Sequence, residues 1–340
     1  MLIAVDAMGG DDAPRAPIEG ASLAARDGIE VVLVGDRAKL TPELERLGNP
    51  AGLVIEHAGE VVGMDEKPTA VRRKRDASVR VCARLVKEGR AQAVVTAGNT
   101  GAAMIAAKTV MGGIPGIERP ALAAVFPRRG GHTVILDVGA NVDARPEHLG
   151  QFAIMGHFYA QGVLGKASPR VGLLSVGEED VKGNELTRQA REVIEQAGLD
   201  FVGNVEGSDV FSGRADVVVC DGFVGNVVLK SNESLAGFLG SLMRQALGQS
   251  WRTRLGYWLA RPAFDTYRRQ TDWSEYGAVP LLGVRGGFFI GHGRSGARAM
   301  RNAIQRAIDF CEADLHNKIR DKVAELGNPE TPASSVETNR

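Results

Sequence analysis

TVILDVGANVD, residues 133–143, decides the fold, because a β-branched apolar run ends there in a loop of glycine and polar residues. Short apolar runs bounded by glycine are typical of strands buried in a parallel sheet. Comparable runs recur at residues 2–5, 31–35, 93–98, 171–177 and 215–222. We therefore predict a sheet of mostly parallel strands.

Segments with helical spacing of apolar residues separate these runs, at residues 17–27, 77–89, 101–111, 146–161 and 184–197. The alternation predicts an α/β fold in which helices flank the sheet. An apolar stripe from Met300 to Val323 predicts a further long amphipathic helix that begins after Ser295.

No linker or repeat divides residues 1–327, and we predict one folded domain with two lobes. Residues 328–340 are rich in proline, serine and charge, which predicts a mobile tail.

The composition of the chain excludes several classes of function. The chain has 41 basic and 41 acidic residues, so its overall charge gives no reason to expect nucleic acid as a partner. Its three cysteines are far apart, which argues against a disulfide framework. No apolar run approaches the roughly 20 residues that cross a bilayer, and the start MLIAVDAMGG lacks the features of a signal peptide. These features predict a cytoplasmic protein.

Four glycine-containing loops follow predicted strands, and each also carries asparagine, aspartate or lysine: AGNTGA (97–102), DVGANVD (137–143), GEEDVKGN (177–184) and DGFVGN (221–226). Each alone is readily explained as an ordinary turn. Ligands of parallel sheets bind at the carboxyl ends of strands, so the four loops together predict one site.

GHGRSG at 291–296 has the spacing of a dinucleotide fingerprint, but no strand with an acidic ribose-binding residue follows its helix. We therefore reject a dinucleotide site there. Ser295 is instead predicted to cap the helix, whose free amides, with His292 and Arg294, suit a phosphate. A capped helix that binds nothing is an equally good interpretation. No motif or histidine spacing indicates a metal or another cofactor.

The ordered motifs resemble one family closely: VDAMGGDDAP (5–14), AGNTGA (97–102), ERPALA (118–123), LDVGANVD (136–143), GEEDVKGN (177–184), GNVEG (203–207) and CDGFVGNVVLK (220–230). This family is the bacterial acyl-acyl-carrier-protein:phosphate acyltransferases of phospholipid synthesis. The resemblance runs to about residue 325. The last motif departs from it, since GHGRSGA has glycine where the family usually has alanine before the histidine, and lacks the asparagine after the serine.

The resemblance implies a fold similar to phosphotransacetylases and isopropylmalate dehydrogenases. It also implies that the chain transfers a fatty acyl group from acyl carrier protein to inorganic phosphate. The product, acyl phosphate, is the acyl donor for phosphatidic acid and hence phospholipid synthesis. Phosphate is a competent nucleophile and a thioester is activated, so alignment and oxyanion stabilisation are sufficient, without a covalent intermediate.

Lys182 resembles the catalytic lysine of the family, although a lysine in such a loop is otherwise expected to be a surface residue. We predict Asn226 as an amide donor and Asp221 as the residue that orients Lys182 or accepts a proton. Cys220 is a poor nucleophile candidate, because Asp221 beside it raises the thiol pKa. The remaining predicted walls of the site, each of which has turn stabilisation as its alternative role, are Asn99, Thr100, Asp137, Asn141, His292 and Ser295.

Two segments suggest partners. The basic run Arg72, Arg73, Lys74 and Arg75 fits docking of the acidic carrier protein, or is simply a solvated surface. Between 242 and 262, arginines accompany an apolar set at helical spacing that includes Trp251, Leu255, Trp258 and Leu259. Such a set suits an interfacial membrane helix, a dimer contact or a core helix. The resemblance favours reversible contact with the inner face of the membrane and a homodimer.

Two other functions compete with acyl transfer. One is a nicotinamide-dependent dehydrogenase of the same broad fold. The other is a membrane-surface scaffold for lipid-synthesis enzymes.

Overall fold

The structure is a computed structural model that describes residues 1–264 and 277–326. Its centre is one sheet of eleven strands in the order β3-β2-β1-β4-β11-β10-β5-β6-β9-β7-β8. The strands are β1 (Leu2–Asp6), β2 (Glu30–Gly35), β3 (Leu53–His57), β4 (Ala93–Thr96), β5 (Ala121–Arg128), β6 (Gly131–Leu136), β7 (Val171–Leu174), β8 (Phe201–Val205), β9 (Val217–Val219), β10 (Ala278–Leu282) and β11 (Gly287–Gly291).

Most neighbouring strands run parallel, which confirms the predicted α/β fold with a mostly parallel sheet. The antiparallel pairs lie at the centre, where β10 joins β11 to β5, and β5 forms a hairpin with β6. The sequence analysis did not anticipate this hairpin. Its turn contains Gly130 and Gly131, both with positive φ, which lets the chain reverse at little steric cost.

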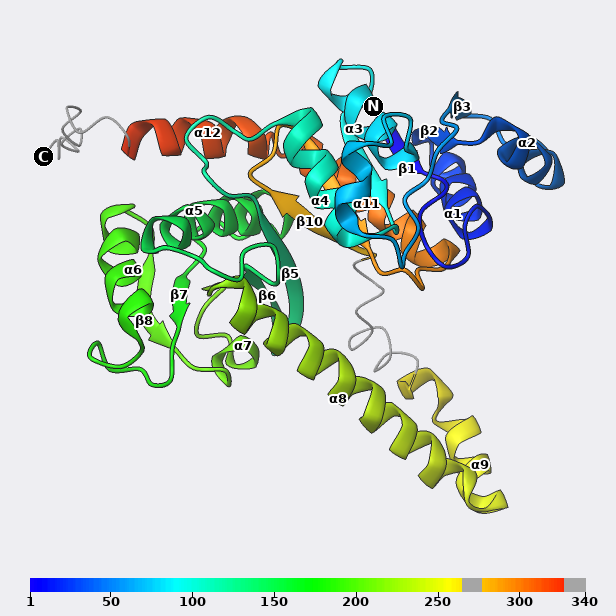
Figure 1. Cartoon of the computed structure of the whole chain (residues 1–340). Helices are drawn as coiled ribbons and strands as arrows, with labels where there is room; N and C mark the ends of the chain where they lie inside the picture. The colour runs from blue at the N-terminus through cyan, green and yellow to red at the C-terminus, as the bar shows by residue number, and fades with distance from the viewer. Residues whose placement is uncertain (265–276, 327–340) are drawn as a thin grey trace, which may run out of the picture.

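Helices cover both faces of the sheet (Figure 1). Those packed on one face are α1 (Arg15–Arg26), α2 (Arg37–Arg46), α5 (Pro146–Val163), α6 (Glu185–Gln196), α11 (Ala297–Glu312) and α12 (Leu315–Leu326). Those on the other are η1 (Pro68–Arg72), α3 (Ser78–Lys87), α4 (Thr100–Ala106) with its π-helical continuation η2 (Ala107–Met111), and α7 (Asp209–Ser212).

The predicted single C-terminal helix is wrong in one respect. It is two helices, because the chain breaks at Asp314, which has a positive φ of 50°. The apolar stripe continues through Leu315 and Ile319 of α12, which are both buried, so the pattern alone did not reveal the break.

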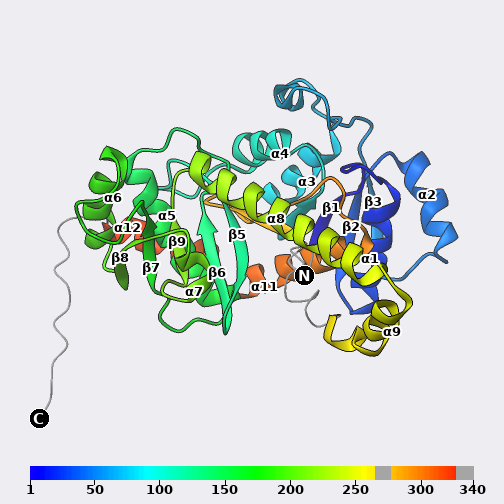
Figure 2. The ribbon, with the colours of Figure 1, turned by 90° about the horizontal axis from the view of Figure 1, so that it is seen from below.

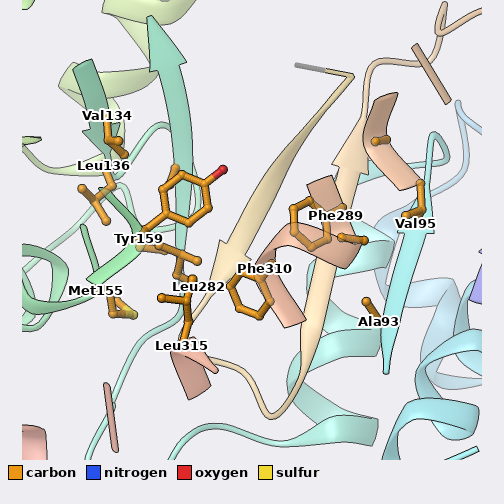
Figure 3. Close-up of a cluster of buried hydrophobic side chains, with 14 of the residues drawn as sticks. Ala93, Val95, Val134, Leu136, Met155, Tyr159, Leu282, Phe289, Phe310 and Leu315 are labelled. Carbon is orange, nitrogen blue, oxygen red and sulfur yellow. The ribbon is translucent and has the colours of Figure 1, made fainter. Parts of the chain in front are cut away.

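The protein has two lobes, one built on β1–β4 and β11 and the other on β5–β9. The two lobes share one sheet and one continuous apolar cluster. Figure 3 shows Leu136 and Tyr159 from the lobe of β6 beside Leu282, with Phe289 and Phe310 continuing the cluster toward β4. The domain boundary at residue 327 remains a prediction, and the predicted tail at 328–340 lies outside the described residues.

One pair of helices leaves the body of the protein. The helix α8 (Gly222–Gly248) starts after β9, the third strand from the β8 edge of the sheet, and projects outward to α9 (Trp251–Leu259). Figure 2 shows α8 passing beneath both lobes. Among residues of α8, Gly222 and Gly225 are buried, both in its first turn. The helix is therefore anchored at its amino end.

Candidate functional site

The loop after β6 is organised by the buried carboxylate of Asp137. Its oxygens accept hydrogen bonds from the backbone N–H groups of Leu122, Gly139, Ala140 and Asn141, at 2.6 to 3.2 Å, and from the Asn141 side chain at 3.0 Å. Burial raises the pKa of Asp137, and these hydrogen bonds partly offset that effect. Asp137 and Asn141 therefore hold the loop in shape.

The start of α8 packs against this loop with almost no space to spare. A Cβ atom at Gly225 would lie 1.9 Å from the carbonyl oxygen of Asp137, and one at Gly222 would lie 2.7 Å from that of Asn141. The motif DGFVGN thus needs both glycines for close approach. Asp221 caps the helix, since its carboxylate accepts from the N–H groups of Phe223 and Val224 at 2.9 Å.

This packing places Asn226 against the loop. A Cβ at Gly139 would lie 3.5 Å from Oδ1 of Asn226, an ordinary van der Waals distance, so the amide lies directly beside this glycine. The helix carries Asn226, Leu229, Lys230 and Glu233 at spacings of three and four, and all four line one cavity.

From the other lobe, the loop after β4 approaches the same cavity. Asn99 caps α4 through Ala102 N–H and donates from Nδ2 to the carbonyl oxygens of Gly63, Met64 and Glu66. Thr100, the first residue of the helix, lines the cavity. Asn99 therefore positions Thr100, as Asp137 positions Gly139.

The loop after β11 contributes the last polar group. His292 lines the cavity, and its Nδ1 accepts from the Arg294 N–H at 3.2 Å. The predicted cap is wrong: Gly296, one residue beyond Ser295, is at the N-cap of α11, and no side chain caps that helix. Ser295 is buried behind the loop, and its hydroxyl has no hydrogen-bond partner among the described residues.

The cavity has a volume of about 350 Å³, within the ~300–1,000 Å³ usual for small-ligand sites. Its lining includes the polar side chains of Thr100, Asn226 and His292 and the charged side chains of Lys230, Glu233 and Arg306. The other walls are mainly apolar, formed by Leu122, Ala124, Val125, Val138, Leu229, Val279 and Ile290. Such a cavity suits a ligand with a polar head and a hydrocarbon tail.

The structure thus brings three of the four predicted loops to one cavity. The fourth contains Lys182, which is exposed and is not among the lining residues. Its loop follows β7, a neighbour of β9 whose own loop leads into α8. A catalytic role for Lys182 therefore remains a prediction, as do the roles of the other predicted site residues.

Cys220 is buried beneath this site. Its sulfur lies 3.6 Å from the carbonyl oxygen of Asp137, and burial together with Asp221 and Asp137 raises the pKa of the thiol well above its usual value. A thiol held protonated in this way is a poor nucleophile.

The predicted docking run begins at Arg72, the last residue of η1. The helix η1 packs on α4, where a Cβ at Gly101 would lie 2.6 Å from Pro68. Arg72, Arg73 and Arg75 are exposed, whereas Lys74 is tied to Glu66 at 2.6 Å and to the carbonyl oxygen of Val61. Lys74 is therefore engaged within the protein.

Comparison with known proteins identifies the family. Residues 1–318 match the model of the family described as fatty acid synthesis protein. The chain is 50% identical over 327 residues to the phosphate acyltransferase of Geobacter sulfurreducens, covering 95% of this chain and 94% of that one. It is 50% identical over 329 residues to the phosphate acyltransferase of Pelobacter propionicus, covering 96% and 95%. The chain belongs to this family of phosphate acyltransferases.

Solved structures agree with the fold of this phosphate acyltransferase family. A phosphotransacetylase from Streptococcus pyogenes superposes with a TM-score of 0.62 at 17% identity, covering 92% of this chain and 94% of that one. A branched-chain phosphotransacylase from Enterococcus faecalis gives 0.57 at 14% identity, covering 92% and 99%. These likenesses confirm the predicted phosphotransacetylase-like fold. Among the described residues, no helix is long and apolar enough to cross a membrane.

Proposed function

We propose that this phosphate acyltransferase transfers a fatty acyl group from acyl carrier protein to inorganic phosphate, and that the acyl phosphate feeds phospholipid synthesis. The observation that carries the proposal is one cavity that combines the polar side chains of Thr100, Asn226 and His292 with mainly apolar walls. Release of the carrier thiol only when phosphate is present tests it. A nicotinamide-dependent dehydrogenase and a membrane scaffold both predict no such release.

In this reaction an oxygen of hydrogen phosphate attacks the thioester carbonyl carbon. The new C–O bond forms, the carbonyl oxygen becomes an oxyanion, and the C–S bond then breaks to release the carrier thiolate, which takes up a proton. The Asn226 amide and the Thr100 hydroxyl, which both line the cavity, are proposed as donors to this oxyanion. Preorganised donors of this kind stabilise an oxyanion without reorganisation during the reaction.

Lys182 completes this proposal as a mobile cation. Its loop lies on the same edge of the sheet as those of Asp137 and Asp221, because β7, β6 and β9 run parallel, and its side chain is exposed. We propose that this side chain reaches the phosphate. An ammonium there offsets the charge of phosphate. Asp221 caps α8, and its predicted role of orienting Lys182 or accepting a proton stays a prediction.

The exposed arginines beside η1 are proposed to dock the acidic carrier protein, because they lie next to the helix that carries Thr100. Changing Arg72, Arg73 and Arg75 together to glutamate should raise KM for the acylated carrier protein about tenfold or more, with kcat nearly unchanged. Steady-state kinetics at two ionic strengths measure this. An unchanged KM would place the docking surface elsewhere.

The projecting pair α8 and α9 is proposed to provide both the dimer contact and the membrane contact. Leu235, Phe238, Leu239 and Leu242 of α8 are exposed at helical spacing, which suits packing against a second copy. The side chains of Trp251 and Trp258 in α9 are 70% and 66% exposed, and Arg252 and Arg254 stand beside them. Tryptophan with arginine suits an anionic bilayer surface.

Changing Trp251 and Trp258 to serine should reduce binding to anionic phospholipid vesicles about tenfold or more while the sedimentation mass stays that of the wild type. Changing Leu235 and Leu239 to glutamine should instead lower the mass. Vesicle co-sedimentation and analytical ultracentrifugation separate the two effects. Vesicle binding that survives the tryptophan changes would contradict the assignment of α9.

A further inference from the structure

The cavity lies where the ladder between two central strands stops. Within the described residues, β10 pairs with β5 at Leu281 with Leu122 and at Leu282 with Ala121. The same register would bring Pro280 opposite Ala123, Val279 opposite Ala124 and Ala278 opposite Val125, but none of these positions carries a ladder pair. Val279, Ala124, Ala278 and Val125 all line the cavity.

Proline explains why the strands separate there. Pro280 lies between the paired and the separated parts of β10, and it has no N–H to donate to a neighbouring strand. On its other side, β10 continues its pairing with β11 from Ala278 to Pro280. The edge of β10 that faces β5 is therefore open over the residues that line the cavity.

The cavity consequently reaches both faces of the sheet. Ala124 and Val279 belong to the apolar cluster on the face of α4, whereas Tyr159 of α5 belongs to the cluster on the opposite face. Figure 3 shows the Tyr159 hydroxyl directed toward the space between β5 and β10. Thr100 of α4 and Leu229 of α8, which packs on the same cluster as α4, also line the cavity, so the lining spans both sides of the opening between β5 and β10.

Among the described residues, the lysine and the arginine that line the cavity each form an ion pair. Lys230 pairs with Glu233 at 2.8 Å within α8, and Arg306 pairs with Asp309 at 3.0 Å within α11. Each lining cation thus has a counter-ion on its own helix. The separated strands themselves contribute aliphatic side chains, a surface from which water is readily displaced by hydrocarbon.

We infer that the opening between β5 and β10 is a channel for the acyl chain. The reacting thioester lies at Asn226 and Thr100, and the chain passes through the sheet toward Tyr159. Ala124 and Ala278 set the width of the channel and Tyr159 limits its length, so these residues determine acyl-chain specificity. This inference rests on the proposed acyl transfer and deepens it.

A larger side chain at the opening and a smaller side chain at its far wall should change the acyl-chain specificity in opposite directions. Each buried methylene raises kcat/KM about fourfold. Ala278→Leu, or Ala124→Leu from the facing strand, should lower the ratio of kcat/KM for the longest to the shortest saturated acyl donor, on the order of tenfold or more. Tyr159→Leu removes part of the far wall and should raise that ratio. Thermal melts identify any variant that fails to fold.

Val227→Ala is the matched control, because Val227 is exposed on α8 and does not line the cavity. The ratio of kcat/KM for the longest to the shortest acyl donor should be the same in this variant as in the wild type. Unchanged ratios in folded Ala278→Leu and Tyr159→Leu would overturn the channel, and a change confined to Val227→Ala would place the chain on the outer face of α8.

The same variants separate this inference from the proposed function. If the wild type makes no acyl phosphate from any donor, the proposed function fails. Binding of a fluorescent fatty acid then decides the channel: it should weaken in Ala278→Leu and stay constant in Val227→Ala. Equal binding by these two folded variants would reject the channel as well.

Discussion

Gly225→Ala is expected to destabilise the protein by about 3 kcal/mol, at the upper end of the ~1–3 kcal/mol typical of overpacked sites. The added Cβ would lie 1.9 Å from the carbonyl oxygen of Asp137 and 3.0 Å from the sulfur of Cys220. The backbone oxygen cannot rotate away, because the Asp137 carboxylate is fixed by the amides of its own loop. Relief therefore requires the whole start of α8 to move.

Urea unfolding measures this effect, and Gly237→Ala is its matched control. Gly237 lies in the same helix, but a Cβ there would meet nothing within 4 Å. Replacing an exposed helical glycine by alanine should stabilise by up to about 1 kcal/mol. Equal effects of the two changes would show that α8 does not pack on the Asp137 loop as described.

Asn226→Ala is expected to lower kcat by about 10²- to 10³-fold, the usual cost of removing one oxyanion donor. The residue is exposed on the first turns of α8, and its amide faces Gly139 and the cavity. Stability should stay near that of the wild type, because little packing is lost. The substitution should change kcat more than KM, since the donor acts mainly on the transition state.

Asn226→Asp keeps the shape and places a carboxylate beside the phosphate, so it should be at least as inactive as the alanine variant. Lys182→Ala is the comparison for the neighbouring loop and should raise KM for phosphate as well as lower kcat. Full activity of Asn226→Ala would remove this residue from the mechanism. Full activity of Lys182→Ala would return Lys182 to the role of an ordinary surface lysine.

The sequence predicted the layered fold and most of the polar residues that line the cavity, because both depend on local signals. Glycine and asparagine at strand ends marked the loops of Thr100 and Asn226, and spacing marked the helices between the strands. The caps formed by Asn99 and Asp221 act within three residues, which explains why their loops were recognisable.

The apolar part of the site depends on pairing between strands far apart in the chain. Pro280 and Ala124 gain their importance only because β10 pairs with both β11 and β5. The hairpin of β5 and β6 was missed because the sequence analysis identified the run of β6 as a strand but not residues 121–128, which form β5. The break at Asp314 escaped notice because the apolar stripe runs through it.

The most direct measurement of the central claim combines the purified chain with acylated carrier protein and labelled inorganic phosphate. Acyl phosphate and free carrier thiol are quantified together. The account predicts one thiol released for each labelled acyl phosphate, no release without phosphate, and a large loss of both products in Asn226→Ala. Thiol release that does not require phosphate, or the absence of labelled acyl phosphate, would contradict it.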